Sequence, residues 1–591
     1  MTGQKKVQKR KGVIRRFFVD LGKTRRYFFL ALAIIIVIKL CLAAAPMVVS
    51  WITDTMQQFV TTGSYDYGLL LKGCGVLALL YFIGYGGDGI VNRTMVYVSQ
   101  NLILILRNKA GKKLNRLTLQ YSDSHPLGDM QSRVTNDMMN LSNGLESTVP
   151  SLLGQAVQMV AICVMMLFTN YLLALIYIIA IPLTMVGLRV IAKKTNKVFK
   201  QTNQQLGKMS SIVSDTYSNH TIVKAYGRVE EKEKKFDEEN KEFERLFVKS
   251  RFTSGFMRPF SDLMAKASYI LLCLIGGIMM LNGQLTLGGF MAFLFFGNMI
   301  GVPITELSVA FNNFQDSLSS AARIYEFLDE DEEPEESPSG SLSISGINGK
   351  ISFEHVRFGY VPEKTLMKDV SFTAKPGQTM AIVGPSGAGK TTLINLLMRF
   401  YDIQGGKITL DDVDIKELSR QNLRDAFGMV LQDTWIFDGT IAENIAFGKP
   451  GATREEVIAA AKTAYCDSFI ERLPDGYDTH LSNENSALSA GEKQLLSIAR
   501  AIIADPKVLI LDEATSQVDT KTEEVITRAM QELMKGRTSF IIAHRLYTIR
   551  NADQIIFMVD GDIKEVGSHD ELLKKKGCYA SMYESGVSMG E

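Results

Sequence analysis

One segment of the sequence carries a pattern that binds phosphate. An apolar strand, 380–383, runs into Gly384-x-x-x-x-Gly389-Lys390-Thr391 and then into a helical segment. Glycines at this spacing let backbone N–H groups wrap a phosphate, and the helix start that follows favours negative charge. Lys390 would reach the β- and γ-phosphates of a nucleotide, and Thr391 would offer a hydroxyl to Mg²⁺. The same loop and helix start also contain Ser386, Gly387 and Thr392.

A second apolar run, VLILDE, ends in the adjacent acids Asp512 and Glu513. Two carboxylates at the end of a buried strand are costly unless they serve a cation or a water. Asp512 can hold Mg²⁺ through water, and Glu513 can polarise an attacking water as the general base. His544 follows another apolar run, SFIIA. A lone His there is more often a structural hydrogen-bonding group, but beside the other motifs a γ-phosphate contact is favoured.

Six apolar segments in the first half of the chain predict membrane spans, since a helix needs roughly 20 residues to cross a bilayer core. They are 28–49, 73–87, 149–168, 171–188, 267–281 and 287–305, and two of them, 73–87 and 267–281, extend through mildly polar neighbours. Residues 1–26 carry ten Lys and Arg against one acid, whereas the loops predicted to face outward (50–71, 169–170 and 282–286) carry none. Both termini are therefore predicted to be cytoplasmic. The six cysteines have no paired spacing, which predicts neither disulfides nor a cysteine metal site.

The fold class that follows is a multidomain one, with an all-α six-helix transmembrane domain and an α/β P-loop domain. Residues 189–266 have a charged helical pattern, and each arm of such a hairpin could project roughly 40 Å below the membrane. The expected divisions are a basic cytoplasmic segment, 1–26, a membrane domain, 27–325, an acidic linker, 326–347, and a nucleotide-binding domain, 348–591.

Together these motifs resemble those of ABC exporters. Tyr360, the P-loop, Gln432, LSAGEKQ, LILDEATS and His544 stand in the order and approximate spacing of ABC ATPases. With the six spans, the chain from about residue 15 to residue 583 is similar to an ABC exporter half-transporter. The resemblance implies that Tyr360 stacks on the adenine of ATP, that Gln432 links Mg²⁺ and the attacking water to the membrane domain, and that Asp519 touches an opposing ATPase domain. Tyr121, Gly128, Ser132, Arg133, Asp137 and the segment 220–228 resemble two intracellular loops that carry coupling helices in that family.

In this family ATP lies between two ATPase domains, so the resemblance implies a dimer in which Ser489, Gly491 and Glu492 face a partner's P-loop. Glu492 replaces the usual Gln, and two readings stay open. Ser489 and Glu492 have the spacing of a capping box, in which the acid returns to the Ser backbone N–H. Alternatively, Glu492 repels the γ-phosphate, because two like charges about 6 Å apart cost roughly 3 kcal/mol at an effective dielectric near 20. Asn483 also stands where a Glu is expected, and the combination resembles the catalytically competent subunit of heterodimeric multidrug exporters. A heterodimer is favoured over a homodimer.

The cargo is less defined by the sequence. Lys39 is the one charge within 28–49; it could face a cavity, snorkel or contact another helix. Asn298, Thr305, Glu306, Asn312 and Asn313 could line a polar cavity, and Phe290, Phe293, Phe295 and Phe296 could form an aromatic wall or pack between helices. The resemblance favours export of amphipathic drugs across a bacterial plasma membrane, with lipid or peptide cargo, or a nucleotide-gated channel, as alternatives. The partners expected are a second half-transporter, membrane lipids and the amphipathic cargo. Six spans argue against action on nucleic acid.

Overall fold

The computed structural model describes residues 12–13, 15–63, 66–334, 346–361, 364–431, 434–482, 488–512, 520–543 and 546–584. The chain divides into two compact units. The first, which we call the membrane unit, contains Met1–Leu117 and His125–Glu332. The second, the α/β unit, contains Thr118–Ser124 and Glu333–Glu591.

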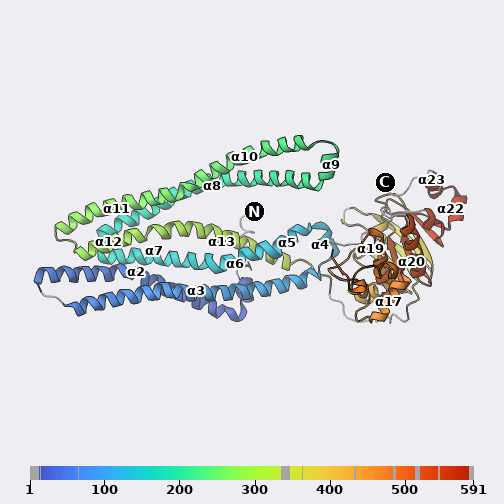
Figure 1. Cartoon of the computed structure of the whole chain (residues 1–591), viewed down its shortest axis with the longest axis horizontal. Coiled ribbons are helices and arrows are strands. Elements are labelled where there is room, and N and C mark those ends of the chain that lie inside the picture. Colours follow the sequence, from blue (N-terminus) through green and yellow to red (C-terminus); the bar gives the residue numbers. More distant parts are fainter. Residues whose placement is uncertain are drawn as a thin grey trace. The chain divides into compact units, whose positions relative to one another are not determined.

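The membrane unit holds six helical rods that are long and apolar enough to cross a bilayer, which confirms the six predicted spans. Figure 1 shows them as long helices lying roughly alongside one another. The elements of this unit are η1 (Gly22–Thr24), α2 (Arg25–Thr62), α3 (Tyr67–Leu114), α5 (Leu127–Ser132), η2 (Arg133–Asp137), α6 (Met138–Asn143), η3 (Gly144–Thr148), α7 (Val149–Thr169), α8 (Tyr171–Ser218), α9 (His220–Ala225), α10 (Val229–Gly255), α11 (Met257–Leu281), α12 (Leu287–Met299) and α13 (Gly301–Leu328).

Much of the segment 50–71, which is predicted to face outward, is helical. The helix α2 continues beyond the apolar run 28–49 to Thr62. The hydroxyls of Thr53 and Thr55 donate to carbonyls four residues earlier in the helix, and the Asp54 carboxylate accepts from the Thr286 hydroxyl and the Gly288 N–H at the start of α12. Gly63, at φ +68°, then ends α2, and the Asp66 carboxylate caps α3.

The helical hairpin predicted over 189–266 is present. The helices α8 and α10 run side by side, and α9 closes the turn between them (Figure 1). Buried Gln205 of α8 joins the two arms by donating a hydrogen bond of 3.1 Å to the backbone carbonyl of Glu239. Nearer the tip, Lys232 pairs with Asp215 at 2.8 Å.

The third rod is interrupted by two π-helical segments, η2 and η3, on either side of α6. Such segments rotate the residues that follow and often mark functional sites. Buried Asp137 of η2 accepts hydrogen bonds from the guanidinium of Arg323 on α13, one of them 2.8 Å long. Gly144 of η3 lies directly against the Ser317 side chain of α13, where a Cβ atom would be only 2.3 Å from the Ser hydroxyl. The π segments therefore bring this rod close to α13.

The α/β unit is built on a six-stranded sheet in the order β12-β11-β3-β10-β9-β6. The central strands β3, β10 and β9 are parallel and almost wholly buried, as expected when helices cover both faces of a sheet. A four-stranded antiparallel sheet has the order β2-β1-β4-β5, and β7 pairs with β8. The strands are β1 (Ile351–Phe358), β2 (Met367–Ala374), β3 (Thr379–Val383), β4 (Gly405–Leu410), β5 (Val413–Asp414), β6 (Phe427–Val430), β7 (Gly439–Thr440), β8 (His480–Leu481), β9 (Val508–Asp512), β10 (Thr538–Ile542), β11 (Gln554–Val559) and β12 (Asp562–Gly567).

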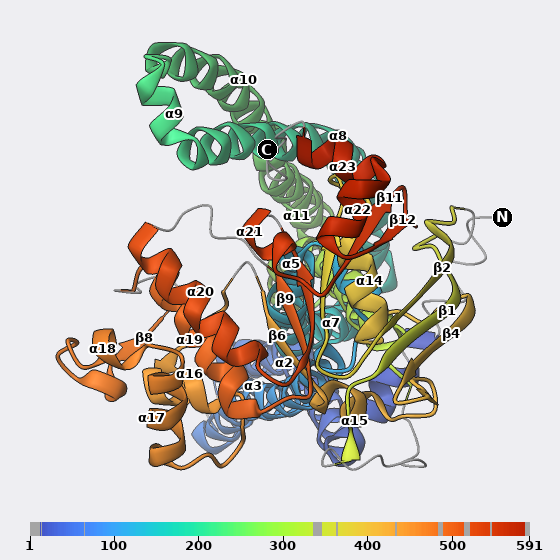
Figure 2. The ribbon, with the colours of Figure 1, turned by 90° about the vertical axis from the view of Figure 1, so that its right-hand side faces the viewer.

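Two hydrophobic cores lie on opposite faces of the six-stranded sheet. Figure 2 shows α16, α17, α19 and α20 gathered on one side, and α14 with the antiparallel sheet on the other. The helices of this unit are α4 (Leu119–Ser124), α14 (Lys390–Leu397), α15 (Arg420–Asp425), α16 (Ile441–Ala446), α17 (Arg454–Thr463), α18 (Asp467–Ile470), η5 (Gly476–Asp478), α19 (Ala490–Ala504), α20 (Thr520–Met534), α21 (Leu546–Arg550), α22 (His569–Lys575) and α23 (Cys578–Glu584).

Candidate nucleotide site

The predicted P-loop connects β3 to α14, in the strand–loop–helix context that phosphate binding requires. Gly384 passes so close to β11 that a Cβ atom would lie 2.2 Å from the Met558 carbonyl oxygen. Gly389 precedes α14 at φ +99°, a conformation that glycine adopts without strain. No side chain in the described part of the sequence caps the start of α14, so its first N–H groups are open to an anion.

Lys390 already points into the loop that would hold phosphate. Its ammonium nitrogen donates to the carbonyl oxygens of Gly384, at 2.8 Å, and Pro385, at 3.1 Å. Burial lowers the pKa of Lys390, and the negative charge of Asp512 acts in the opposite direction. Since phosphate oxygens can replace these two carbonyls around the ammonium group, the loop fits a nucleotide phosphate.

Two of the three predicted metal-binding residues, Thr391 and Asp512, lie at the same edge of the sheet. Asp512 ends β9 opposite Ile542 of β10, which in turn lies opposite Ile382 of β3. Because parallel strands end at the same edge, the Asp512 carboxylate and the P-loop are neighbours. Thr391 is exposed at the start of α14, whereas Thr392 is buried. Ser386 and Gly387 are exposed in the loop. Gln432, Glu513, Asp519, His544 and Asn483 lie outside the described residues.

Tyr360, the predicted adenine platform, belongs to an aromatic cluster that sequence reasoning missed. Its hydroxyl shares a hydrogen bond of 3.0 Å with the Thr392 hydroxyl, and its ring meets the Tyr401 ring edge to face at 5.0 Å. Tyr401 donates a hydrogen bond of 2.5 Å to Asp123 of α4. Burial, followed by that hydrogen bond, raises the pKa of Tyr401, so its hydroxyl stays a donor. The short helix α4, which belongs to the α/β unit, thus contacts the aromatic cluster next to the P-loop helix through Asp123.

The start of α19 shows how Glu492 is bonded within its own helix. Ser489 is its N-cap, and the predicted capping box is confirmed. The Glu492 carboxylate accepts hydrogen bonds from the Ser489 backbone N–H, at 2.8 Å, and from the Ser489 hydroxyl, at 2.9 Å. The Ser489 oxygen in turn accepts from the Glu492 N–H at 3.3 Å. Gly491 is buried within this first turn. The acid therefore takes part in capping its own helix.

Arg500, also on α19, is a second residue that sequence reasoning missed. Its guanidinium donates to the Asn444 carbonyl at 2.9 Å and to the Trp435 carbonyl at 3.1 Å. It also lies over the rings of Trp435 and Phe447. Burial lowers the pKa of Arg500. These contacts tie α19 to α16 and to the segment that precedes α16.

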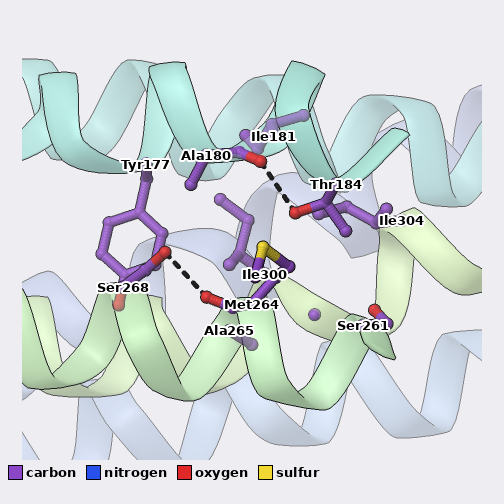
Figure 3. A pocket seen from close by; sticks show the side chains of 11 residues that line it. Tyr177, Ala180, Ile181, Thr184, Ser261, Met264, Ala265, Ser268, Ile300 and Ile304 are labelled. Carbon is purple, nitrogen blue, oxygen red and sulfur yellow. Dashed lines mark hydrogen bonds between the residues drawn. The ribbon is translucent and has the colours of Figure 1, made fainter. Parts of the chain in front are cut away.

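The membrane unit contains a small cavity between α8, α11 and α13 (Figure 3). The Thr184 and Ser268 hydroxyls on its wall donate to carbonyls of their own helices, Ala180 and Met264. Buried Tyr177 reaches it, and within the described residues its hydroxyl has no hydrogen-bond partner. The cavity is therefore lined mainly by apolar surface.

The aromatic wall proposed for the last span is only partly available. Phe293 and Phe296 are fully buried among neighbouring helices, so they serve packing, the other role considered for them. Phe295 remains 46% exposed, and Phe290 packs on Gly276. Asn298 and Thr305 hydrogen-bond to carbonyls of the preceding turn, at 3.1 and 3.0 Å.

Comparison with known proteins agrees with this architecture. Residues 28–304 match the family described as ABC transporter transmembrane region, and residues 367–516 match the family described as ABC transporter. The chain is 44% identical over 483 residues to a fatty acid ABC transporter ATP-binding/permease protein of Mycobacterium tuberculosis, covering 82% of this chain and 76% of that protein. It is 32% identical over 523 residues to an ATP-dependent lipid A-core flippase of Syntrophus aciditrophicus, covering 87% and 86%.

A solved structure of a bacterial Atm1-family ABC exporter with ATP bound superposes with a TM-score of 0.76 at 28% identity, covering 96% of this chain and 99% of that one. The fold and the P-loop define a membrane transporter driven by nucleotide hydrolysis. The chain belongs to the ABC transporter family, as an exporter-type half-transporter that fuses one six-span membrane domain to one ABC ATPase domain. It binds ATP and couples its hydrolysis to transport, and the α/β unit is the ATPase domain.

Proposed function

We propose that this half-transporter exports amphipathic small molecules across a bacterial plasma membrane by alternating access, as one half of a dimer with both termini in the cytoplasm. The observation that carries the proposal is the P-loop of a chain with six spans. Lys390 points into this loop, and no described side chain caps the helix start that follows. The basic tail before the first span supports the orientation.

The roles at the nucleotide follow from the positions of the described residues and from the order of the motifs. Lys390 binds the β- and γ-phosphates, and Tyr360 offers its exposed ring to adenine. Thr391, Asp512 and Gln432 would hold Mg²⁺, which supplies charge neutralisation at the phosphates. Glu513 takes the proton of the attacking water, and His544 contacts the γ-phosphate.

The second half of each composite site comes from a partner subunit, through Ser489, Gly491 and Glu492. The Glu492 carboxylate, folded into its own cap, makes this half less receptive to phosphate than the family's usual Gln would. An altered half beside a complete set of catalytic residues supports a heterodimer, in which Glu492 faces a P-loop that hydrolyses slowly. A homodimer is the alternative.

Two observations support a class of cargo, the names of the relatives and the motifs around Glu492. The names of the mycobacterial and Syntrophus relatives refer to fatty acid and to lipid A-core, which favours lipid-like amphiphiles. Multidrug export rests on the motif combination around Glu492 alone. We therefore place acyl-chain amphiphiles first and drugs second.

Purified chain, alone or with a co-purified partner, reconstituted into vesicles provides the test. Export predicts that ATP drives accumulation of a fluorescent acyl amphiphile against its gradient, and that the amphiphile stimulates hydrolysis. Ion conductance gated by nucleotide, without uphill accumulation, would identify a channel instead. A fluorescent drug in place of the acyl probe separates the two cargo classes.

A further inference from the structure

A pair of opposite charges lies between the first two membrane helices. Lys39 of α2 falls about 17 Å from the start of the apolar run 28–49, at 1.5 Å per residue. Its ammonium nitrogen is 3.9 Å from the Asp88 carboxylate of α3. Charges at such depth are costly, and they usually face a cavity or one another.

A third helix, α7, packs against the Lys39 side chain. Gly154 of α7 is buried against the Lys39 side chain, and a Cβ atom there would lie 3.1 Å from the Lys39 Cε atom. The neighbouring contact of Gly87 with Ile38 lets α2 and α3 approach closely beside the pair. The stem of Lys39 therefore packs on α7, and its ammonium group lies next to Asp88 of α3.

The pair is incompletely formed. A distance of 3.9 Å exceeds that of a charged hydrogen bond, about 2.7–2.9 Å. Within the described residues the ammonium group has no other partner. The Lys39 side chain is 17% exposed, whereas the Asp88 side chain is 50% exposed. An ammonium with free donors thus lies next to a carboxylate that can be displaced.

We propose that Lys39 recognises the acidic head group of an amphiphilic cargo, with Asp88 as the anion that the head group replaces. The proposal deepens the proposed function, on which it rests. Carboxylate and phosphate head groups share the required chemistry, namely an oxyanion that accepts hydrogen bonds from an ammonium group. When no cargo is bound, Asp88 neutralises Lys39 inside the span. When the head group arrives, the exposed carboxylate turns away and Lys39 keeps a counter-charge.

Four probes with the same tail test the proposal: dodecanoate, dodecyl phosphate, dodecanol and dodecylammonium. Stimulation of ATP hydrolysis is measured for the full chain in lipid nanodiscs, as the concentration giving half-maximal effect. The variants are Lys39→Met, Asp88→Asn and the double variant, which avoids an unpaired Asp88 if the single change misfolds. Lys72→Met, at an exposed lysine nearer the start of α3, is the matched control.

We expect Lys39→Met, alone and with Asp88→Asn, to raise the half-maximal concentration of an acidic probe about tenfold while leaving that of dodecanol unchanged. Asp88→Asn alone should lower the value for the acidic probes, because their competitor is gone. The acidic probe affected, carboxylate or phosphate, identifies the head group. Unchanged responses to both acidic probes in Lys39→Met and in the double variant would overturn the proposal. If no probe stimulates even the unaltered chain, the proposed cargo class itself fails, and the role of Lys39 falls with it.

Discussion

Two helix starts in the ATPase domain are both suited to anions, yet they are built differently. Gly389 precedes α14, and no described side chain closes that helix start, which leaves N–H groups and Lys390 for phosphate. Ser489 precedes α19 as its N-cap, and the Glu492 carboxylate accepts a hydrogen bond from the Ser489 backbone N–H. Both helices have a positive N-terminal dipole, but α19 begins with a side-chain capping box and α14 begins without a cap from any described side chain.

Three other helices of the same domain show that the α19 start is an ordinary capping device. The helices α16, α17 and α22 begin with capping boxes that pair Thr440 with Glu443, Thr453 with Glu456 and Ser568 with Glu571. A capping box satisfies N–H groups at a helix start from within the same chain, whereas a start without a side-chain cap leaves such groups available to a bound anion. The comparison indicates that Glu492 stabilises the start of α19 in the same way as these three glutamates stabilise theirs.

The largest effect should come from the proposed general base, Glu513. Glu513→Gln should reduce ATP turnover by roughly 10²–10⁴-fold, because the substitution removes the proposed base, while ATP binding persists. Hydrolysis and nucleotide binding are measured on the same preparation. Glu532→Gln, an exposed acid paired with Lys535, is the control. Near-normal turnover in Glu513→Gln would show that the base lies elsewhere.

Gly389→Ala tests whether phosphate binding at the start of α14 depends on the positive φ of Gly389. An added Cβ would meet only ordinary contacts of 3.4 Å or more, so the cost of Gly389→Ala is conformational. At φ +99° that strain is about 1–2 kcal/mol, and we expect roughly tenfold weaker ATP binding. The rise in melting temperature caused by ATP measures this. Gly111→Ala, in open space on α3, should behave as the unaltered chain, and equal ATP affinity in both would argue against a preformed loop.

A substitution of Glu492, in the capping box of α19, separates the two roles considered for it, helix capping and repulsion of the γ-phosphate. Glu492→Gln keeps a side chain that can cap the helix but removes its charge, so ATP turnover should rise several-fold at a dimer interface where repulsion costs up to about 3 kcal/mol. The matched control is Glu571→Gln in the capping box of α22, which should leave turnover unchanged. If Glu492→Gln also has no effect, the carboxylate stays in its cap and repulsion plays no part.

The smallest effect is expected at the hydrogen bond between Tyr401 and Asp123 of α4. Tyr401→Phe removes the hydrogen bond to Asp123, a loss of about 1.5–3 kcal/mol for a bond to a charged group. We expect cargo to stimulate hydrolysis less, by a few-fold, with ATP affinity unchanged. Tyr465→Phe, at an exposed tyrosine, serves as control. A loss of ATP affinity instead would mean that Tyr401 acts only by supporting the Tyr360 ring.

Local sequence patterns predicted much of this architecture. The apolar runs predicted six membrane helices, the glycine spacing predicted the strand–loop–helix around Lys390, and the Ser489–Glu492 spacing predicted the capping box. Each of these depends on residues close together in the chain, so their physics is local.

Features that depend on distant residues could not be predicted in this way. Tyr401 and Asp123 are 278 positions apart, and nothing in either local pattern indicates that they meet. The pairing of Lys39 with Asp88 likewise requires the packing of α2 on α3. The extension of α2 beyond the apolar run 28–49 could not be predicted from hydropathy, because this part is polar and bonds its threonine hydroxyls within the helix.

The claim on which the account depends is that hydrolysis takes place between two subunits, since one chain brings a P-loop and its partner brings the start of α19. The most direct test measures ATP turnover per chain alongside the fraction of paired subunits, across a dilution series in detergent. We predict that turnover falls in proportion to the paired fraction. Undiminished hydrolysis by fully separated chains would contradict the account.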